Sequence, residues 1–272
     1  MYFGFQNISA AYGKTQIIRN LTLEVCKGET VTIVGPNGCG KSTLLKTVFG
    51  RSRISGDVIL KGRPISDYKP KERGRCLSYL PQVHTGLPDI DVKTLISYGR
   101  YPHMRFGRGL SMNDKRIIDD TVEFTGLSAI TDRQLSTLSG GELQRARVAM
   151  AVCTRPEILM LDEPTTHLDI GCQIEVLELI RRLKDELGMT VLTVLHDLNL
   201  AARYSDRMVA IKDGAIFAEG THKEIMTEEN LHELFGISAN IRTDPKSGVP
   251  YFVPRSPLRK NSDSNGHFGG YS

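Results

Sequence analysis

Short apolar runs separated by turn residues mark the first 60 positions of the chain. These runs predict β-strands, with a turn at Lys27-Gly28-Glu29. The predicted strands are Phe3–Ser9, Gln16–Val25, Thr30–Val34 and Asp57–Leu60. We therefore expect a β-rich lobe at the start of the chain, and we expect this lobe to carry the glycine-rich segment that comes next.

Helical spacing replaces this pattern between Gln82 and Leu138. Apolar residues recur every three or four positions over Val92–Tyr98 and Asn113–Thr125. Because strand signals are few in this stretch, we expect a helical insert over about residues 84–155.

Strands and helices alternate after the insert. Ile158–Leu161 and Thr190–Leu195 are predicted to be buried strands. A helix is predicted between them over Ile170–Leu187, with Gly188 as its C-cap. Such alternation is typical of an α/β fold with a largely parallel sheet.

The last part of the chain contains a hairpin signal and then a change of composition. Asp213-Gly214 predicts a tight turn between strands over Met208–Ile211 and Ile216–Ala218. From about Pro254 onward the residues are rich in Ser, Asn, Gly and basic side chains, which predicts a disordered tail. The expected organisation is a main domain over 1–235, a C-terminal extension over 236–253 and the tail over 254–272.

Composition narrows the class of protein. Of the 272 residues, 40% are hydrophobic, which is enough for a sizeable core, and no apolar stretch approaches the length of a membrane span. The five cysteines form no C-x-x-C pair, so neither a disulfide framework nor a zinc site is indicated. A net charge of +4 is too small to indicate a nucleic-acid partner. With no secretory signal at its start, the chain is expected in the cytosol.

The glycine-rich segment has the sequence Gly35-Pro36-Asn37-Gly38-Cys39-Gly40-Lys41-Ser42-Thr43, which is the pattern of a phosphate-binding P-loop. Glycines allow successive backbone N–H groups to converge on phosphate oxygens. Lys41 can reach the β- and γ-phosphates, and the Ser42 hydroxyl can ligate Mg²⁺. The alternative is a glycine turn without a ligand. The predicted strand before the loop and the helical spacing over Ser42–Phe49 favour ATP and Mg²⁺ binding.

A second motif ends the strand at Ile158–Leu161, where Asp162 and Glu163 follow four apolar residues. This is the arrangement of a Walker B segment, in which Asp162 can hold Mg²⁺ and Glu163 can polarise an attacking water. The alternative is a strand that ends in solvated acids, and the P-loop upstream argues against it.

A third motif lies at Leu138–Arg145. Ser139 and Glu142 form a capping box, which predicts a helix start. Gly140 and Gly141 are not needed for the cap, and they leave backbone N–H groups open to a close anion. The segment therefore predicts a second phosphate-binding helix terminus.

These residues resemble the ATP-binding cassette (ABC) ATPases, whose signature is LSGGQ or LSGGE. The resemblance covers about residues 2–235. It implies an α/β fold with a RecA-like, mostly parallel sheet core, an antiparallel β subdomain and an inserted helical subdomain. A small-molecule P-loop kinase, which would need no signature segment, is disfavoured. Four further positions match family motifs: the adenine-stacking aromatic Tyr12, the Q-loop Gln82, the D-loop Asp169 and the switch histidine His196.

The resemblance also implies roles in catalysis. Glu163 would be the catalytic base, His196 would contact the γ-phosphate, and Gln82 would link Mg²⁺ and water to a partner subunit. Family members pair head to tail, so each ATP lies between one P-loop and the partner's signature helix. This implies a homodimer, with nucleotide contacts from Ser139, Gly140, Gly141, Glu142 and Asp169.

Two variable segments, Asp91–His103 and His196–Tyr204, resemble ATPase subunits of importers for ferric siderophores, haem and cobalamin, the first group being closest. This implies a peripheral subunit on the cytoplasmic face of the inner membrane, which binds a separate permease and acts indirectly with a substrate-binding protein. Alternatives are haem or cobalamin import and a soluble, non-transport ABC ATPase. The segments could also merely pack the insert, but Gly99–His103 suggests no packing role from sequence.

Position 39 of the loop is Cys, where many family members have Ser or Ala. A thiol beside positive helix-terminal dipoles would have a lowered pKa, which predicts a reactive Cys39. The alternative is that Cys39 is a small filler.

Overall fold

The computed structural model describes residues 1–50, 53–82, 89–105, 107 and 109–257, apart from the side chains of Tyr12, Arg53, Ser256 and Pro257. The strands are β1 Phe3–Tyr12, β2 Thr15–Val25, β3 Thr30–Val34, β4 Arg53–Leu60, β5 Arg63–Pro64, β6 Leu77–Leu80, β7 Ile158–Asp162, β8 Thr190–Val194, β9 Arg207–Lys212, β10 Ala215–Gly220, β11 Ile237–Thr243 and β12 Pro250–Pro257. The α-helices are α1 Lys41–Thr47, α2 Pro70–Cys76, α3 Val92–Ser97, α4 Met112–Phe124, α5 Gly140–Cys153, α6 Ile170–Leu187, α7 Leu198–Tyr204, α8 His222–Ile225 and α9 Glu228–Phe235. Short 3-10 helices span Ile65–Asp67, Tyr98–His103, Ser128–Ile130 and Leu135–Thr137.

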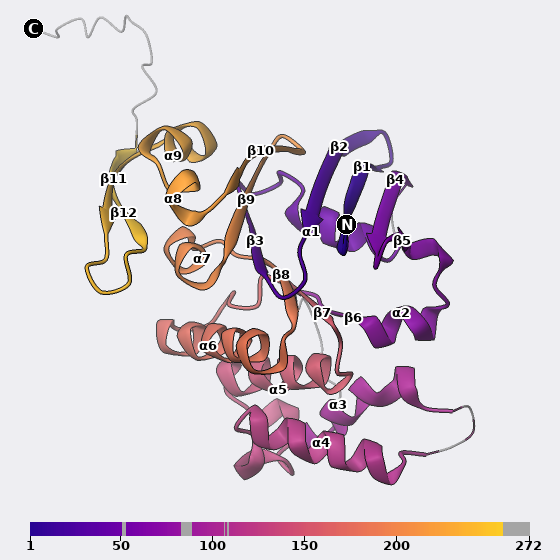
Figure 1. Cartoon of the computed structure of the whole chain (residues 1–272). Helices are drawn as coiled ribbons and strands as arrows, with labels where there is room; N and C mark the ends of the chain where they lie inside the picture. Colours follow the sequence, from indigo (N-terminus) through magenta and orange to yellow (C-terminus); the bar gives the residue numbers. More distant parts are fainter. Residues whose placement is uncertain (51–52, 83–88, 106, 108, 258–272) are drawn as a thin grey trace, which may run out of the picture.

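A six-stranded sheet in the order β10-β9-β3-β8-β7-β6 forms the centre of the molecule (Figure 1). All neighbouring strands run parallel except β9 and β10. Every residue of β3, β7 and β8 is buried, as expected for strands whose two faces are both covered. The predicted α/β class with a largely parallel sheet is confirmed.

A second, antiparallel sheet has the order β2-β1-β4-β5 and lies beside α1 in Figure 1. Its core includes Phe3 and Phe5, whose rings meet edge to face at 5.7 Å. The prediction that this lobe carries the glycine-rich loop is wrong. The loop follows β3, which pairs with β8 and β9 in the parallel sheet. Both faces of Thr30–Val34 are buried, as expected for a central strand.

The segments predicted to be helical between 92 and 125 are helices α3 and α4, which confirms the spacing argument. They pack with α5 around a separate apolar cluster that includes Ile96, Ile117 and Ala149. In Figure 1 this group lies below the central sheet. The boundaries 84–155 for the insert remain a proposal.

The string Gly99–His103 has a packing role that the sequence did not indicate. Arg100 is buried, donates to Asp114 Oδ1 at 2.9 Å and donates to the Cys153 carbonyl at 2.8 Å. The His103 ring is hydrogen bonded to the Thr154 carbonyl at 2.9 Å. Its partners lie 14 to 53 residues away in sequence, so no local pattern could reveal them.

The C-terminal extension is a hairpin of β11 and β12. Asn199 of α7 holds it by donating to the Phe252 carbonyl and accepting from the Phe252 N–H. The tail predicted from Pro254 starts too early, because β12 continues to Pro257. Residues 258–272 lie outside the described residues. Across the described residues, no helix is long and apolar enough to cross a bilayer.

Candidate nucleotide-binding site

The glycine-rich loop joins β3 to α1, and three of its glycines need the conformations that only glycine adopts easily. Gly35, Gly38 and Gly40 have φ angles of 146°, 79° and 107°. A Cβ on Gly35 would lie 2.2 Å from the Ile211 carbonyl, and one on Gly40 would lie 2.5 Å from Ile18 Cδ1. Backbone conformation therefore favours glycine at all three positions, and close packing requires it at Gly35 and Gly40 as well.

Lys41, the first residue of α1, points back into the loop. Its ammonium donates to the carbonyls of Gly35 at 2.8 Å and Pro36 at 2.9 Å, and its side chain is 5% exposed. Among the described residues, no carboxylate forms an ion pair with it. A buried ammonium without a counter-charge fits an anionic ligand, so the loop suits a phosphate.

Ser42 and Asp162 lie together, although they come from α1 and from the end of β7. Ser42 Oγ donates to Asp162 Oδ1 at 2.7 Å, and Tyr79 Oη donates to Asp162 Oδ2 at 3.0 Å. Sequence reasoning missed Tyr79, because only the pairing of β6 with β7 places it there. Within the described residues, no group of three His, Cys, Asp or Glu side chains could hold a metal ion. A hydroxyl and one carboxylate fit Mg²⁺, which usually completes its shell with phosphate oxygens and water.

Glu163 is the meeting point of three donors from three segments. Its Oε2 accepts from Gln82 Nε2 at 2.5 Å and from Thr166 Oγ1 at 3.1 Å, while Oε1 lies 2.5 Å from His196 Nε2. The side chain is 9% exposed, and φ is 54°, an unusual value for a residue with a Cβ. The structure therefore brings together Gln82, Glu163 and His196, to which the resemblance gives catalytic roles, and adds Thr166.

The start of α5 has the predicted capping box. Ser139 Oγ accepts from the Glu142 N–H, and Glu142 Oε2 accepts from the Ser139 N–H at 2.8 Å. These hydrogen bonds, with Arg133 nearby at 3.0 Å, lower the pKa of Glu142. The carboxylate consequently stays ionised at neutral pH.

Gly141 also has a packing role that the sequence did not indicate. A Cβ at Gly141 would lie 2.5 Å from Cys172 Sγ, whereas one at Gly140 would lie 3.4 Å from Leu168. Asp169 caps α6 by accepting from the Cys172 N–H at 2.9 Å. The starts of α5 and α6 are therefore packed directly on each other.

The two glycine-rich helix starts belong to different parts of the fold. Helix α1 packs against β1, β2 and β7, whereas α5 packs against α3, α4, α6 and β6. Figure 1 shows α1 beside the antiparallel sheet and α5 below the central sheet. The predicted adenine contact at Tyr12 concerns a side chain outside the described residues.

Cys39 does not have the environment of a reactive thiol. It is 7% exposed, and burial raises the pKa of its thiol more than the nearby Lys41 ammonium and backbone N–H groups lower it. The prediction of a lowered pKa is wrong, because desolvation outweighs the positive helix start. Cys39 fills space beneath the loop.

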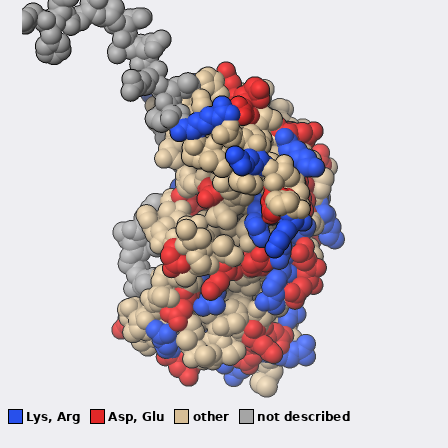
Figure 2. Space-filling view, turned by 90° about the vertical axis from the view of Figure 1, so that its left-hand side faces the viewer, with Lys and Arg blue, Asp and Glu red and all other residues tan. Residues whose placement is uncertain are grey.

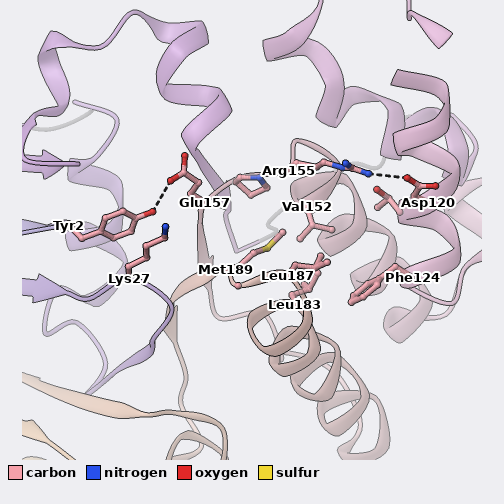
Figure 3. A pocket seen from close by; sticks show the side chains of 13 residues that line it. Tyr2, Lys27, Asp120, Phe124, Val152, Arg155, Glu157, Leu183, Leu187 and Met189 are labelled. Atoms are coloured by element: carbon pink, nitrogen blue, oxygen red, sulfur yellow. Dashed lines mark hydrogen bonds and ion pairs between the residues drawn. The ribbon is translucent and has the colours of Figure 1, made fainter. Parts of the chain in front are cut away.

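A large cavity, of about 530 Å³, lies away from this site (Figure 3). Its apolar floor includes Phe124, Leu183 and Met189, and the Arg155–Asp120 ion pair and the Tyr2–Glu157 hydrogen bond lie at its edges. These residues surround the amino ends of β7 and β8. Ligands of parallel α/β sheets bind at the carboxyl ends, where Ser42, Asp162 and Glu163 lie.

Comparison with known proteins supports a nucleotide site. The family model for ABC transporters matches residues 18–166. The iron(3+)-hydroxamate import ATP-binding protein FhuC of Bacillus subtilis is 43% identical over 247 residues, covering 90% of this chain and 91% of that protein. The ferric enterobactin transport ATP-binding protein FepC of Escherichia coli is 41% identical over 253 residues, covering 92% of each.

A solved structure, of a metal-chelate type ABC transporter in an inward-facing conformation, matches the fold with a TM-score of 0.81 and 25% identity, covering 94% of this chain and 98% of that chain. The family model alone covers more than half of the chain. The glycine-rich loop, the Asp162–Glu163 strand end and relatives matched over about nine-tenths of their length agree with it. The chain therefore belongs to the ABC transporter ATP-binding proteins, which bind and hydrolyse ATP.

Proposed function

We propose that this chain is the ATP-hydrolysing subunit of an importer that takes up an iron(III)-siderophore, or a related metal chelate, through a separate membrane permease. The observation that carries the proposal is identity above 40%, over nine-tenths of the chain, to two import or transport ATP-binding proteins for ferric siderophores. The fold match to a metal-chelate type transporter supports the same class of cargo.

The active unit in this proposal is a head-to-tail homodimer. The glycine-rich loop and the start of α5 are both suited to phosphate, yet they pack against different elements of the chain. A second copy allows both to meet one ATP. Ser139, Gly140, Gly141, Glu142 and Asp169 of each copy then face the nucleotide held by the partner, and Tyr12 stacks on adenine in its own copy.

The residues around the loop bind and orient the nucleotide. Lys41 exchanges its two carbonyl partners for phosphate oxygens, and the loop N–H groups from Gly35 to Thr43 surround the same phosphates. Ser42 and Asp162 would hold Mg²⁺, with Gln82 near its shell. When bound, Mg²⁺ neutralises charge on the β- and γ-phosphates.

Glu163 acts as the general base in this proposal and accepts a proton from the attacking water at a carboxylate oxygen. Gln82, Thr166 and His196 fix the direction of that carboxylate through the contacts described above. His196 is 42% exposed at its side chain, so it can also contact the γ-phosphate.

The helical insert offers a surface for the permease. Tyr98 and Tyr101 stack at 5.3 Å and are 36% and 57% exposed, and Met112 is 81% exposed. A contiguous exposed apolar patch commonly marks a protein contact, and the two stacked tyrosine rings form such a patch. The buried Arg100–Asp114 pair joins the 3-10 helix that carries the two tyrosines to α4, which carries Met112. The chain would thus be peripheral at the cytoplasmic face of the inner membrane, and a substrate-binding protein would act on the other side.

Nucleic acid is not expected as a partner. Figure 2 shows acidic and basic side chains interspersed on the face it presents, without one large basic field. Together with a net charge of +4, this does not favour a phosphate backbone as ligand.

Uptake measurements in the host cell test which class of solute the importer takes up. Deleting the gene for this chain should abolish uptake of at least one radiolabelled ferric siderophore and leave haem and cobalamin uptake unchanged. A gene for the wild-type chain should restore uptake, and a gene for Lys41→Met should not. If all ferric siderophores still enter while haem or cobalamin uptake is lost, the cargo belongs to that other class. If no uptake changes, the chain serves no importer of these classes.

A further inference from the structure

Arg147 lies on α5, two turns after the helix start, and its guanidinium reaches the segment that carries Gln82. Nη2 donates to the Pro81 carbonyl at 2.8 Å, and Nη1 donates to Gln144 Oε1 at 2.9 Å. Gln144, on the same helix, is buried and fixes the direction of the guanidinium. One planar group therefore joins α5 to the backbone immediately before Gln82.

The Arg147 guanidinium donates to two uncharged oxygens, a backbone carbonyl and a side-chain amide. Among the described residues, Arg147 has no carboxylate partner, whereas Arg145 on the same helix pairs with Glu175. Burial lowers the pKa of Arg147 to about 10, so it remains protonated at neutral pH. A partly buried cation without a counter-charge costs free energy. In this position the Arg147 guanidinium gains a hydrogen bond to the Pro81 carbonyl.

The Pro81 carbonyl that Arg147 binds belongs to the residue immediately before Gln82. Gln82 follows Pro81 and donates to Glu163 Oε2 at 2.5 Å. At the other end, Ser139 and the glycines of the signature segment begin α5, about 12 Å from Arg147 at about 1.5 Å per residue. Helix α5 therefore carries two features. Its start faces the partner's nucleotide in the proposed dimer, and Arg147, two turns later, contacts the residue before Gln82.

We propose that Arg147 is a positioning residue for Gln82. Through Gln82, Arg147 transmits a displacement of α5 to the Glu163 carboxylate in the same chain. The proposal rests on the dimer and on the role of Glu163 given above. When the start of α5 binds the partner's ATP, α5 moves as a rigid helix, and the guanidinium carries Pro81 and Gln82 with it. Hydrolysis in one site then depends on nucleotide in the other.

A double-mutant cycle on the full chain tests this coupling. The wild type, Arg147→Met, Gln82→Ala and the double variant are compared by kcat and KM for ATP hydrolysis in Mg²⁺. Arg147→Met should lower kcat by roughly 10- to 100-fold, because a small misplacement of a catalytic group has effects of that size. KM should stay within about twofold, because the P-loop is untouched. In the Gln82→Ala background, Arg147→Met should change kcat by less than about twofold.

Two further variants separate positioning from folding. Arg181→Met removes an exposed guanidinium from α6 and should leave kcat unchanged. Arg147→Lys keeps the charge but cannot hold both oxygens with one planar group, so it should show a smaller loss of kcat at an unchanged melting temperature. If Arg147→Met does not fold, the cycle is run with Arg147→Lys.

The outcomes distinguish this proposal from the one on which it rests. If the wild type does not hydrolyse ATP, the ATPase function itself fails. If the wild type hydrolyses ATP but the Arg147 substitution lowers kcat by the same factor with Gln82 and with Gln82→Ala, Arg147 does not act through Gln82. An unchanged kcat in a folded Arg147→Met variant would also overturn the proposal.

Discussion

The contacts of single residues define what each side chain can do in the site. Glu163 has a left-handed backbone and accepts from Gln82, Thr166 and His196, so its carboxylate has one fixed orientation. Strained backbone of this kind costs about 1–3 kcal/mol, and it persists where surrounding contacts determine it. Lys41 lacks such a charged partner: within the part of the chain that the structure describes, its ammonium donates to two backbone carbonyls, which a phosphate can replace.

Cys39 should react slowly with alkylating agents. Burial raises the pKa of its thiol and hides it from solvent, so at pH 7 N-ethylmaleimide should modify it at least roughly tenfold more slowly than the exposed Cys26. Its rate should keep rising above about pH 8.5, the ordinary cysteine pKa. Peptide mass spectrometry over time measures both rates. Equal rates, with protection of Cys39 by ATP, would restore the reactive-thiol hypothesis.

At the scale of elements, local signals predicted some parts well and missed others for physical reasons. Helix α6 has the predicted length, and Gly188 ends it with φ of 64°. The Asp213-Gly214 turn has positive φ at both residues, as a tight hairpin turn requires. Strand β6 is only four residues long and is defined by pairing with β7. Strand β12 contains three prolines, which argue against a strand except at an edge.

Gly141→Ala tests the packing of α5 on α6. Its new Cβ would overlap Cys172 Sγ, and such overpacking typically costs about 1–3 kcal/mol of unfolding free energy. Gly140→Ala, which makes an ordinary contact with Leu168, should change it by less than about 0.5 kcal/mol. Adding Cys172→Ala should recover part of the loss. Urea unfolding measures the unfolding free energy of the wild type, the two glycine variants and the Gly141→Ala, Cys172→Ala double variant. Equal stability of the two glycine variants would contradict this packing argument.

Arg100→Met tests the buried ion pair that joins the segment Tyr98–His103 to α4. Because Arg100 and Asp114 are 4% and 10% exposed, losing one partner should lower the unfolding free energy by about 3–5 kcal/mol at pH 7. Lys93→Met, which breaks an exposed pair with Asp119, should cost less than about 1 kcal/mol. Urea titrations compare the two variants with the wild type, and similar losses would contradict the importance of burial.

The same pair predicts a dependence on pH. Burial raises the pKa of Asp114, but hydrogen bonds from Ser111 and Arg100 outweigh it, so the pKa is lowered overall. The stabilisation is therefore present above the ordinary aspartate pKa of about 3.9 and is lost as the pH falls through the lower folded value. The difference in stability between wild type and Arg100→Met should shrink below about pH 4. A constant difference would contradict the assignment.

At the scale of the whole molecule, the parallel sheet assembles the site at its carboxyl edge. Sequence motifs placed Lys41, Ser42, Asp162, Glu163 and His196 near one another, because each follows a strand or begins a helix in a recognisable pattern. The same reasoning could not find Tyr79, Thr166 or Arg147, which reach the site through strand register and helix packing. The start of α5 packs against other elements than the P-loop helix α1 does, and in the proposed head-to-tail dimer a second copy would bring the two to one nucleotide.

Glu163→Gln tests the central claim most directly. The purified full chain and this variant are compared by phosphate release from ATP and by size-exclusion chromatography in ATP and Mg²⁺. The account predicts that turnover falls by roughly 10²- to 10⁴-fold, the usual contribution of a general base, while the variant forms an ATP-dependent dimer. A variant that still hydrolyses ATP at the wild-type rate would contradict the role of Glu163, and one that stays monomeric with ATP would contradict the head-to-tail dimer.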